Sequence, residues 1–283
     1  MTQRPERDYV LGTHDEEIER LGLQHRVWRS TVLDCWQRVG ITVGSRVLDV
    51  GAGPGYATFD LAEIVGPTGQ VVAVERSTRF VHAARAVCKA RRYDHVQVHE
   101  ADLMSDPLPV QGMDVAWCRW VASFVSSPTT LVSRIAAAVR PGGVAVFHEY
   151  VNYATWRLAP RRQAVEEFVH HVMESWRAAG GEPDVALRLP WLLADAGFTV
   201  RSAAPKVFCV TPRDHRWRWP ASFITLNLKR LVELGRVDAE WARVVEDEFA
   251  AAERAPETLM VTPMVLEVIA AQRTEKSRAE NGA

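Results

Sequence analysis

The chain has few cysteines, no long apolar run and almost no net charge, and each shortage excludes a class of protein. Its four cysteines are widely spaced and form no Cys-x-x-Cys pair, so neither a zinc site nor a disulfide framework is indicated. No stretch reaches the roughly 18 consecutive apolar residues of a membrane span. The first residues also lack the apolar core of a signal peptide. We therefore expect a reduced, cytoplasmic protein without a bound metal.

The balance of charge gives no reason to expect a nucleic acid or an anionic membrane as a partner. The formal net charge is −1, and the arginine-rich stretches are short and interrupted, which is typical of solvated surface. At 283 residues, 47% of them hydrophobic, the chain is long enough for one large domain with a substantial insertion. A small-molecule substrate is the expectation, and a homodimer is a compatible oligomeric state.

The first half of the chain alternates strand patterns with helix patterns. Short apolar runs predict strands over residues 46–50, 70–74, 95–99, 114–118 and 144–148. Helical spacing or helix end signals predict helices over residues 14–38, 56–65, 77–92 and 128–139. The strands are apolar rather than alternating, as expected where both faces of a sheet are covered. The pattern predicts a doubly wound α/β fold with a parallel sheet.

The second half is richer in helix and in tryptophan. Helical patterns cover residues 157–180, 186–196 and 214–254, and a long strand is predicted over 198–210. Residues 259–271 are apolar and β-branched, and we interpret them as a strand returning to the sheet, with a buried helix as the competing interpretation. The result is a seven-stranded, mostly parallel sheet.

We divide the chain into three parts on this basis. They are an N-terminal helical cap (1–40), an α/β core (41–156), and the rest of the sheet with its insertions (157–283). The insertions at 157–185 and 214–254 are expected to form a lid over the carboxyl edge of the sheet.

The strongest motif is VLDVGAGPGYAT, which runs from Val47 to Thr58. Its glycines allow positive φ and close approach of a ligand, and the helix that follows presents free N–H groups. In open α/β sheets this strand end is where ligands bind. A dinucleotide fingerprint needs glycine at the first, third and sixth positions. Here Gly51, Gly53 and Gly55 take the first, third and fifth, and Tyr56 fills the sixth, so a nicotinamide cofactor is disfavoured.

The sequence resembles the class I, Rossmann-like S-adenosylmethionine-dependent methyltransferases over about residues 9–150. After the glycine motif, the landmarks VVAVERS, EADLMSDP, DVAWCRWV and RPGGVAVFHE follow in the order of that family. LLADAGF and TPMVLEVIA match its later layout more generally. The likeness is greatest to the small-molecule enzymes, a group that includes the quinone C-methyltransferases and many natural-product methyltransferases.

The resemblance implies a set of cofactor contacts. Glu75 would accept hydrogen bonds from the ribose hydroxyls, and Asp102 from the adenine amine with Leu103 nearby. The complete set of expected contacts with S-adenosylmethionine, or with its product S-adenosylhomocysteine, is Tyr9, Gln24, Asp49, Gly51, Ala52, Gly53, Gly55, Glu75, Arg76, Asp102, Leu103, Cys118 and Arg119. Each has a simpler interpretation as a surface or capping residue.

No universal catalytic residue is required, because the sulfonium already makes the methyl group electrophilic. If the acceptor needs a base, His148 and Glu149 at the end of the fifth strand are the best placed. Adjacent strand residues point to opposite faces, so we expect only one of the two to reach the pocket. Four late or strand-end tryptophans, Trp120, Trp156, Trp217 and Trp219, are candidates to line a pocket for an aromatic acceptor. Trp28, Trp36 and Trp191 are expected to be packing residues.

Methyl transfer to oxygen, nitrogen or carbon of a small aromatic or apolar metabolite is the leading hypothesis. A protein of the same fold that binds the cofactor but catalyses a cyclisation is the alternative. An NAD-dependent oxidoreductase is less favoured, because Tyr56 fills the position where the dinucleotide fingerprint has its third glycine.

Overall fold

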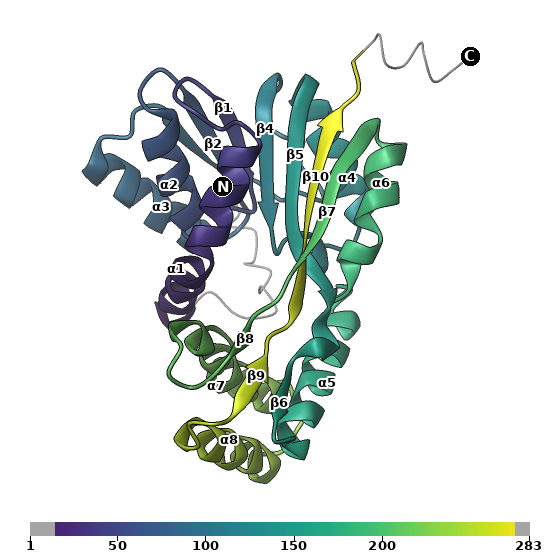
Figure 1. Cartoon of the computed structure of the whole chain (residues 1–283). Coiled ribbons are helices and arrows are strands. Elements are labelled where there is room, and N and C mark those ends of the chain that lie inside the picture. The colour runs from purple at the N-terminus through teal and green to yellow at the C-terminus, as the bar shows by residue number, and fades with distance from the viewer. Residues whose placement is uncertain (1–14, 275–283) are drawn as a thin grey trace.

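The computed structural model describes residues 15–274 of the chain (Figure 1). The α-helices are Asp15–Arg38 (α1), Tyr56–Val65 (α2), Thr78–Arg91 (α3), Pro128–Ala138 (α4), Gln163–Ala178 (α5), Leu189–Asp195 (α6), Arg218–Glu233 (α7) and Ala239–Arg254 (α8). Single 3-10 turns lie at Ala122–Phe124 (η1), Tyr153–Thr155 (η2), Val185–Leu187 (η3) and His215–Trp217 (η4). The strands are Arg46–Val50 (β1), Gln70–Glu75 (β2), Val96–Glu100 (β3), Met113–Arg119 (β4), Val139–Asn152 (β5), Arg157–Ala159 (β6), Phe198–Lys206 (β7), Cys209–Val210 (β8), Leu259–Val261 (β9) and Met264–Gln272 (β10).

The central sheet has seven strands in the order β3-β2-β1-β4-β5-β10-β7. The first five are parallel, and β10 lies antiparallel between β5 and β7. Strand β1 sits in the middle, with Val47 paired to Val71 on β2 and to Val115 on β4. The order reverses on the two sides of β1, which creates the crevice at the carboxyl ends where such sheets bind ligands. The predicted seven-stranded, mostly parallel sheet is confirmed.

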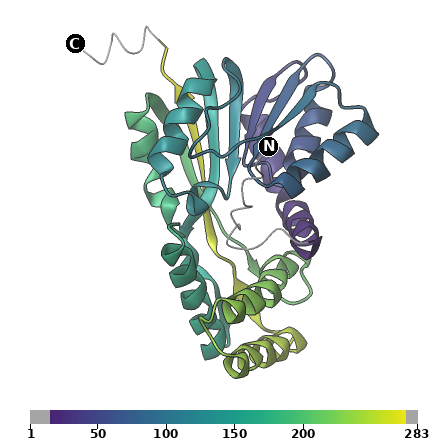
Figure 2. The ribbon, with the colours of Figure 1, turned by 180° about the vertical axis from the view of Figure 1, so that it is seen from behind.

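Helices cover both faces of this sheet (Figures 1 and 2). Helices α1 and α2 pack on one face, against side chains such as Val47 and Val146. Helices α4 and α6 pack on the other, against Leu48 and Phe147. The inner strands β1, β2, β4 and β10 therefore bury both sets of their alternating side chains, which explains their continuously apolar sequences, whereas the edge strands β3 and β7 keep exposed side chains. Helix α3 packs beside α2 and β3.

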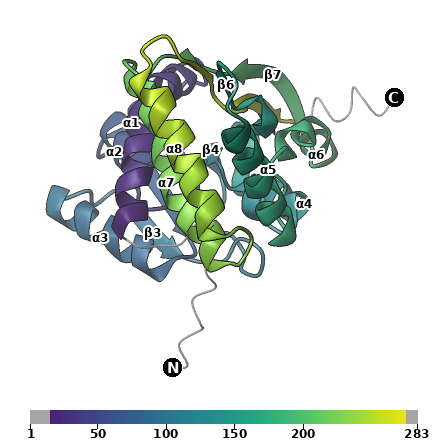
Figure 3. The same ribbon diagram turned by 90° about the horizontal axis from the view of Figure 1, so that it is seen from below.

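Beyond one end of the sheet lie α5, α7 and α8 (Figure 1). From here on, we call these three helices, and not residues 1–40, the cap. Seen from below, α7 and α8 run side by side between α1 and α5 (Figure 3), and α7 contacts both α1 and α5. A three-stranded sheet in the order β6-β9-β8 supports the cap. Strand β8 follows β7 along the chain, and β9 precedes β10. These two extended connections join the cap to the central sheet.

The second half departs from expectation in three places. Residues 157–159 form β6, so the helix predicted from 157 begins only at Gln163. The long strand predicted over 198–210 is divided into β7 and β8, which belong to different sheets. Residues 259–271 are strand as predicted and not a buried helix, but they are divided into β9 and β10, which belong to different sheets. The small sheet was missed because strands of two or three residues carry no detectable period.

Candidate active site

A cavity of about 700 Å³ opens at the carboxyl edge of the sheet, between α1, the glycine loop and the cap. This volume is within the usual range of small-molecule sites. One half of its wall is polar and comes from the ends of β1, β2 and β3. The other half is aromatic, and its principal rings are Trp117, Trp120, Phe124, Tyr150, Trp176 and Phe223. We call these the polar half and the aromatic half.

The glycine loop forms the floor of the polar half. Gly51 and Ala52 donate their N–H groups to the Val74 carbonyl, at 2.9 and 3.0 Å. Gly51 has a φ of 66°, and a Cβ atom there would lie 2.3 Å from the Val121 side chain. Only glycine therefore fits between β1 and the segment after β4. A Cβ atom at Gly53 would meet nothing within 4 Å, so the backbone there faces open space.

Glu75 at the end of β2 fixes the loop and faces the cavity. Its carboxylate accepts hydrogen bonds from the N–H groups of Gly53, Arg76 and Ser77, at 2.8 to 2.9 Å. Burial raises the pKa of Glu75, and the three N–H groups oppose that shift. Since a carboxylate offers about four acceptor positions, Glu75 retains acceptor capacity for a ligand.

Asp102 and Leu103 line the next part of the polar half. The Asp102 carboxylate accepts the Met104 N–H at 2.8 Å, and the Asp102 N–H donates to Asp106 at 2.9 Å. This local turn is the capping arrangement expected if Asp102 had only a structural part. It occupies one carboxylate oxygen and leaves the other able to accept a hydrogen bond.

Asp49 lies beneath the loop and is 2% exposed. It accepts a hydrogen bond from the Thr58 hydroxyl at 2.6 Å. Burial raises the pKa of Asp49 to about 6, although the Thr58 hydrogen bond and the charge of Arg119 act in the opposite direction. Asp49 thus supplies negative potential directly below the glycine loop.

Arg119, at the end of β4, lies where the two halves meet. Its Nη2 atom is 3.0 Å from Nδ1 of His25, and Nε2 of His25 is 3.1 Å from the Asp60 carboxylate. Burial lowers the pKa of Arg119 to about 10, so the guanidinium remains charged at neutral pH. The Arg119 guanidinium carbon lies 5.0 Å from the ring centre of Trp120, within cation–π distance.

The aromatic half is built around Trp120. Its ring stacks on Tyr150 and on Trp219, both at 5.8 Å between ring centres. Trp120 has a φ of 53°, in the left-handed region that non-glycine residues rarely adopt. Such strain is typical of functional positions. Trp176 packs against both Tyr150 and Phe124.

Helix α1 closes the cavity on the side of the cap. Gln24 is buried, and its side-chain oxygen accepts hydrogen bonds from Arg20 and from the Trp219 indole. Tyr56 points toward α1, where its hydroxyl donates to the Ile18 carbonyl and its ring covers Gly22. The bulk of Tyr56 is therefore taken up against α1. Tyr9, the other expected contact from this region, lies outside the described residues.

Several predicted site residues do not line the cavity. Trp156 is buried against Phe168 and Phe223, and Trp217 is buried against Phe249 under α8, so the expectation that these two line a substrate pocket is wrong. Trp219 does not line the cavity itself, but it stacks on Trp120 and donates a hydrogen bond to Gln24, and both of these residues do. The Gly55 position is shaped by packing, because a Cβ there would meet Phe59 and Ala84. The Cys118 thiol is fully buried in the sheet.

Of the tryptophans predicted to be packing residues, Trp28 and Trp36 are core residues, whereas Trp191 is 54% exposed.

His148 and Glu149 point to opposite faces, as predicted, but neither lines the cavity. Glu149 accepts hydrogen bonds from the N–H groups of Val121, Ala122 and Ser123 and from the Ser123 hydroxyl. It therefore holds the segment that follows β4. Burial raises the pKa of Glu149 to about 7. A part as catalytic base stays a prediction for both residues, and the geometry favours a structural part.

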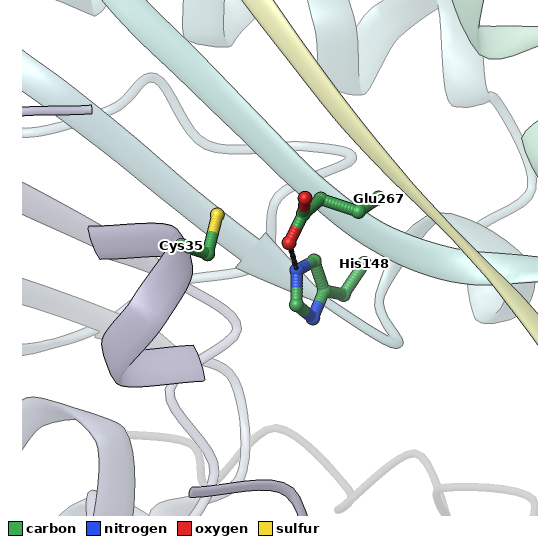
Figure 4. Close-up of side chains that lie close together, drawn as sticks. All are labelled: Cys35, His148 and Glu267. Atoms are coloured by element: carbon green, nitrogen blue, oxygen red, sulfur yellow. Dashed lines mark hydrogen bonds and ion pairs between the residues drawn. The ribbon is translucent and has the colours of Figure 1, made fainter. Parts of the chain in front are cut away.

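His148 belongs to a buried cluster with Cys35 of α1 and Glu267 of β10 (Figure 4). Its Nε2 atom is 3.0 Å from the Glu267 carboxylate, which also pairs with Arg38 at 2.7 Å and Lys206 at 3.3 Å. One side-chain atom each of Cys35, His148 and Glu267, of the kind that can bind a metal ion, lies within 4.8 Å of the other two. Two cations beside one carboxylate make a divalent cation electrostatically unfavourable there. We interpret the cluster as the attachment of α1 to β5 and β10.

Sequence reasoning missed several cavity residues. Arg20, His25, Tyr150, Trp176 and Phe223 come from α1, β5, α5 and α7. Tyr150 had a usable signal, since it follows the predicted strand end at 148. The others lie on helices where the sequence gives no reason to distinguish a cavity residue from a core residue.

Comparison with known proteins agrees with this geometry. The methyltransferase domain family matches residues 47–143. The demethylmenaquinone methyltransferase of Lactococcus lactis is 29% identical over 150 residues, which cover 53% of this chain and 57% of that protein. The chain spans about half the length of the first curated relatives that it matches.

Solved structures share the fold at low identity. A methyltransferase from Bacillus halodurans C-125 has a TM-score of 0.56 and 19% identity, with 87% of this chain and 100% of that chain covered. The [4+2]-cyclase SpnF has a TM-score of 0.54 and 20% identity, with 87% and 80% covered. No helix within residues 15–274 is long and apolar enough to cross a membrane. Residues 47–143 thus match the methyltransferase domain family, and the fold of the chain is shared with a methyltransferase of known structure.

Proposed function

We propose that the chain transfers a methyl group from S-adenosylmethionine to an oxygen, nitrogen or carbon atom of a small aromatic or apolar metabolite. The observation that carries this proposal is the continuity of the cavity. One space joins a polar half suited to a nucleoside with an aromatic half suited to a flat acceptor. The demethylmenaquinone methyltransferases, which resemble about half of the chain, support an aromatic, quinone-like acceptor.

The polar half fits the cofactor on four observations. The backbone at Gly53 faces open space, so a ligand can approach it closely. Glu75 is held by three N–H groups and retains acceptor capacity for ribose hydroxyls. Asp102 lies at the next strand end, where the adenine amine would be bound. No diphosphate-binding glycine stands at position 56, in agreement with a nucleoside without phosphates.

Positioning accounts for the chemistry. When bound, S-adenosylmethionine supplies a methyl group on an electron-poor sulfonium sulfur. The chain's own residues hold the acceptor in line and exclude water, through the buried rings of Trp120, Tyr150 and Trp176. Holding two reactants in this way can lower a barrier by roughly 7–11 kcal/mol. A base on the aromatic half is therefore not required.

The test is turnover with detection of S-adenosylhomocysteine. The purified chain is incubated with S-adenosylmethionine and a panel of naphthols, hydroquinones and aromatic acids, and both products are measured by mass spectrometry. Methylated acceptor together with an equal amount of S-adenosylhomocysteine supports the proposal. Failure to bind S-adenosylhomocysteine in calorimetry would contradict it.

A second candidate is cyclisation without methyl transfer. It is favoured by one specific finding, the shared fold of the [4+2]-cyclase SpnF. A cyclisation would proceed with the cofactor left intact. Product formation without release of S-adenosylhomocysteine would therefore favour it over methyl transfer. A natural-product pathway, a cytoplasmic location and a homodimer stay predictions.

A further inference from the structure

The guanidinium of Arg119 is an incompletely satisfied cation in the wall of the cavity. Its Nη1 atom is buried and has no hydrogen-bond partner among residues 15–274. Within the same range Arg119 forms no ion pair with a carboxylate. A buried cation without a partner is costly, and buried polar groups left unsatisfied in a folded protein often mark a ligand site.

The partner that Arg119 does have leaves its charge uncompensated at short range. Nη2 can only donate, so Nδ1 of His25 accepts, and the ring proton of His25 stands on Nε2 facing Asp60. Burial lowers the pKa of His25 as well, which keeps the ring neutral. Arg29 holds Asp60 from the surface side at 2.8 Å. The chain of contacts thus orients the guanidinium and leaves one of its terminal nitrogens for another acceptor.

The surroundings of Arg119 point to the aromatic half. Its guanidinium carbon is 5.0 Å from the ring centre of Trp120 and 5.8 Å from that of Trp117. Tyr150 stacks on the same Trp120 ring. The carboxylates that line the cavity (Asp49, Glu75, Glu100, Asp102 and Asp106) all come from β1 to β3 or the turn after β3. The aromatic half therefore offers an acceptor a cation but no carboxylate base.

We propose that Arg119 is an oxyanion subsite for the methyl acceptor, which is a flat aromatic carboxylic acid or acidic phenol. The planar guanidinium suits a carboxylate or phenolate oxygen, and the neighbouring rings suit the flat body of such a molecule. The inference rests on the proposed methyl transfer. The carboxylate of the cofactor has the same chemistry, so the experiment separates these two sources of the oxyanion.

Calorimetry on the full chain provides the test. The first arm titrates S-adenosylhomocysteine and its decarboxylated analogue. The second arm titrates naphthalene-2-carboxylate and the neutral naphthalene-2-carboxamide in the presence of S-adenosylhomocysteine. The variants are Arg119→Gln, Arg119→Lys and the control Arg201→Gln, an exposed arginine of β7 away from the cavity.

The wild type and Arg201→Gln should bind the carboxylate at least roughly tenfold more tightly than the carboxamide. Arg119→Gln should remove this preference by weakening the carboxylate about 10- to 100-fold, while S-adenosylhomocysteine binds as before. Arg119→Lys should retain part of the preference. Retained binding of S-adenosylhomocysteine also shows that a variant is folded.

Two results would overturn the inference. One is a wild type without preference for the carboxylate, a measurement that needs no variant. The other is an Arg119→Gln variant that loses affinity for S-adenosylhomocysteine but not for its decarboxylated analogue, since Arg119 would then serve the cofactor. A wild type that does not bind S-adenosylhomocysteine at all would instead overturn the proposed function.

Discussion

The two halves of the cavity recognise ligands by different means. The polar half is made by backbone N–H groups and short acidic side chains at the ends of adjacent strands, all within residues 49–106. The aromatic half is made by large rings from β4, the segment that follows it, β5, α5 and α7. The polar half is thus fixed by the sheet itself, whereas the aromatic half depends on how the cap packs against it. Cofactor binding should tolerate changes in the cap that would alter the choice of acceptor.

Replacing Glu75 by alanine should have the largest effect on the polar half. The change removes the acceptor for the ribose hydroxyls and releases the N–H groups of Gly53, Arg76 and Ser77. We expect affinity for S-adenosylhomocysteine to fall by roughly 100-fold or more, about 3 kcal/mol, in calorimetry. Glu63→Ala, an exposed glutamate of α2, is the matched control. Unchanged affinity in the Glu75 variant would disprove the assignment of the polar half.

Glu267→Gln tests the buried cluster of Cys35, His148 and Glu267, which attaches α1 to β5 and β10. Burial opposes ionisation of Glu267, but hydrogen bonds from His148 and Arg38 lower its pKa to about 2. A depressed carboxyl pKa stabilises the folded state above the unfolded pKa, and the contribution is lost as pH falls toward the folded pKa. We expect the variant to be less stable near neutral pH, by at most about 3 kcal/mol.

The pH dependence makes this prediction specific. Urea unfolding at about pH 7, 5 and 3 should show the gap between wild type and variant narrowing as pH falls through the region below 4.5, the ordinary pKa of a glutamate. Glu257→Gln, an exposed glutamate before β9, should show no such gap. A constant gap at all three pH values would mean that the attachment of α1 does not depend on the charge of Glu267.

The same contrast explains what the sequence could predict. Strands β1 to β5 and the glycine loop follow one another along the chain, so apolar runs and glycines located the polar half, including Glu75 and Asp102. The aromatic half could not be located in this way. Trp176 and Phe223 lie 47 residues apart in the sequence numbering, and they meet only because α5 and α7 pack together. Trp156 and Trp217 have equally aromatic sequence surroundings, yet packing turns them into the core.

Predictions for His148 and Glu149 show a second limit. We predicted that they lie at the end of the fifth strand, and this is wrong, because β5 continues to Asn152, four residues past His148. The two side chains therefore lie inside the sheet and not at its edge. Strand ends are set by pairing with β10, a partner more than 100 residues later in the chain.

Phe124→Ala should affect the aromatic half alone. Phe124 lines the cavity and packs its edge against Trp176 at 4.7 Å between ring centres. Loss of one ring should weaken naphthalene-2-carboxamide, measured with S-adenosylhomocysteine present, by about 1 kcal/mol, roughly fivefold. Affinity for S-adenosylhomocysteine itself should not change. Val43→Ala, which is exposed and distant, is the control. A variant that loses the cofactor but keeps the aromatic probe would contradict the division of the cavity into two halves.

Asp102→Asn gives the smallest effect and separates two interpretations of one residue. Asparagine keeps an oxygen that can accept the Met104 N–H, so the turn and the thermal stability should be preserved. It replaces the second carboxylate oxygen by an amide that cannot accept a hydrogen bond from the adenine amine. We expect S-adenosylhomocysteine to bind roughly three- to tenfold more weakly. S-inosylhomocysteine has an oxygen in place of that amine. The variant's affinity for it, relative to that for S-adenosylhomocysteine, should therefore be higher than in the wild type. If melting temperature falls while the preference between the two nucleosides is unchanged, Asp102 is a turn residue and the adenine is recognised elsewhere on the edge of the polar half.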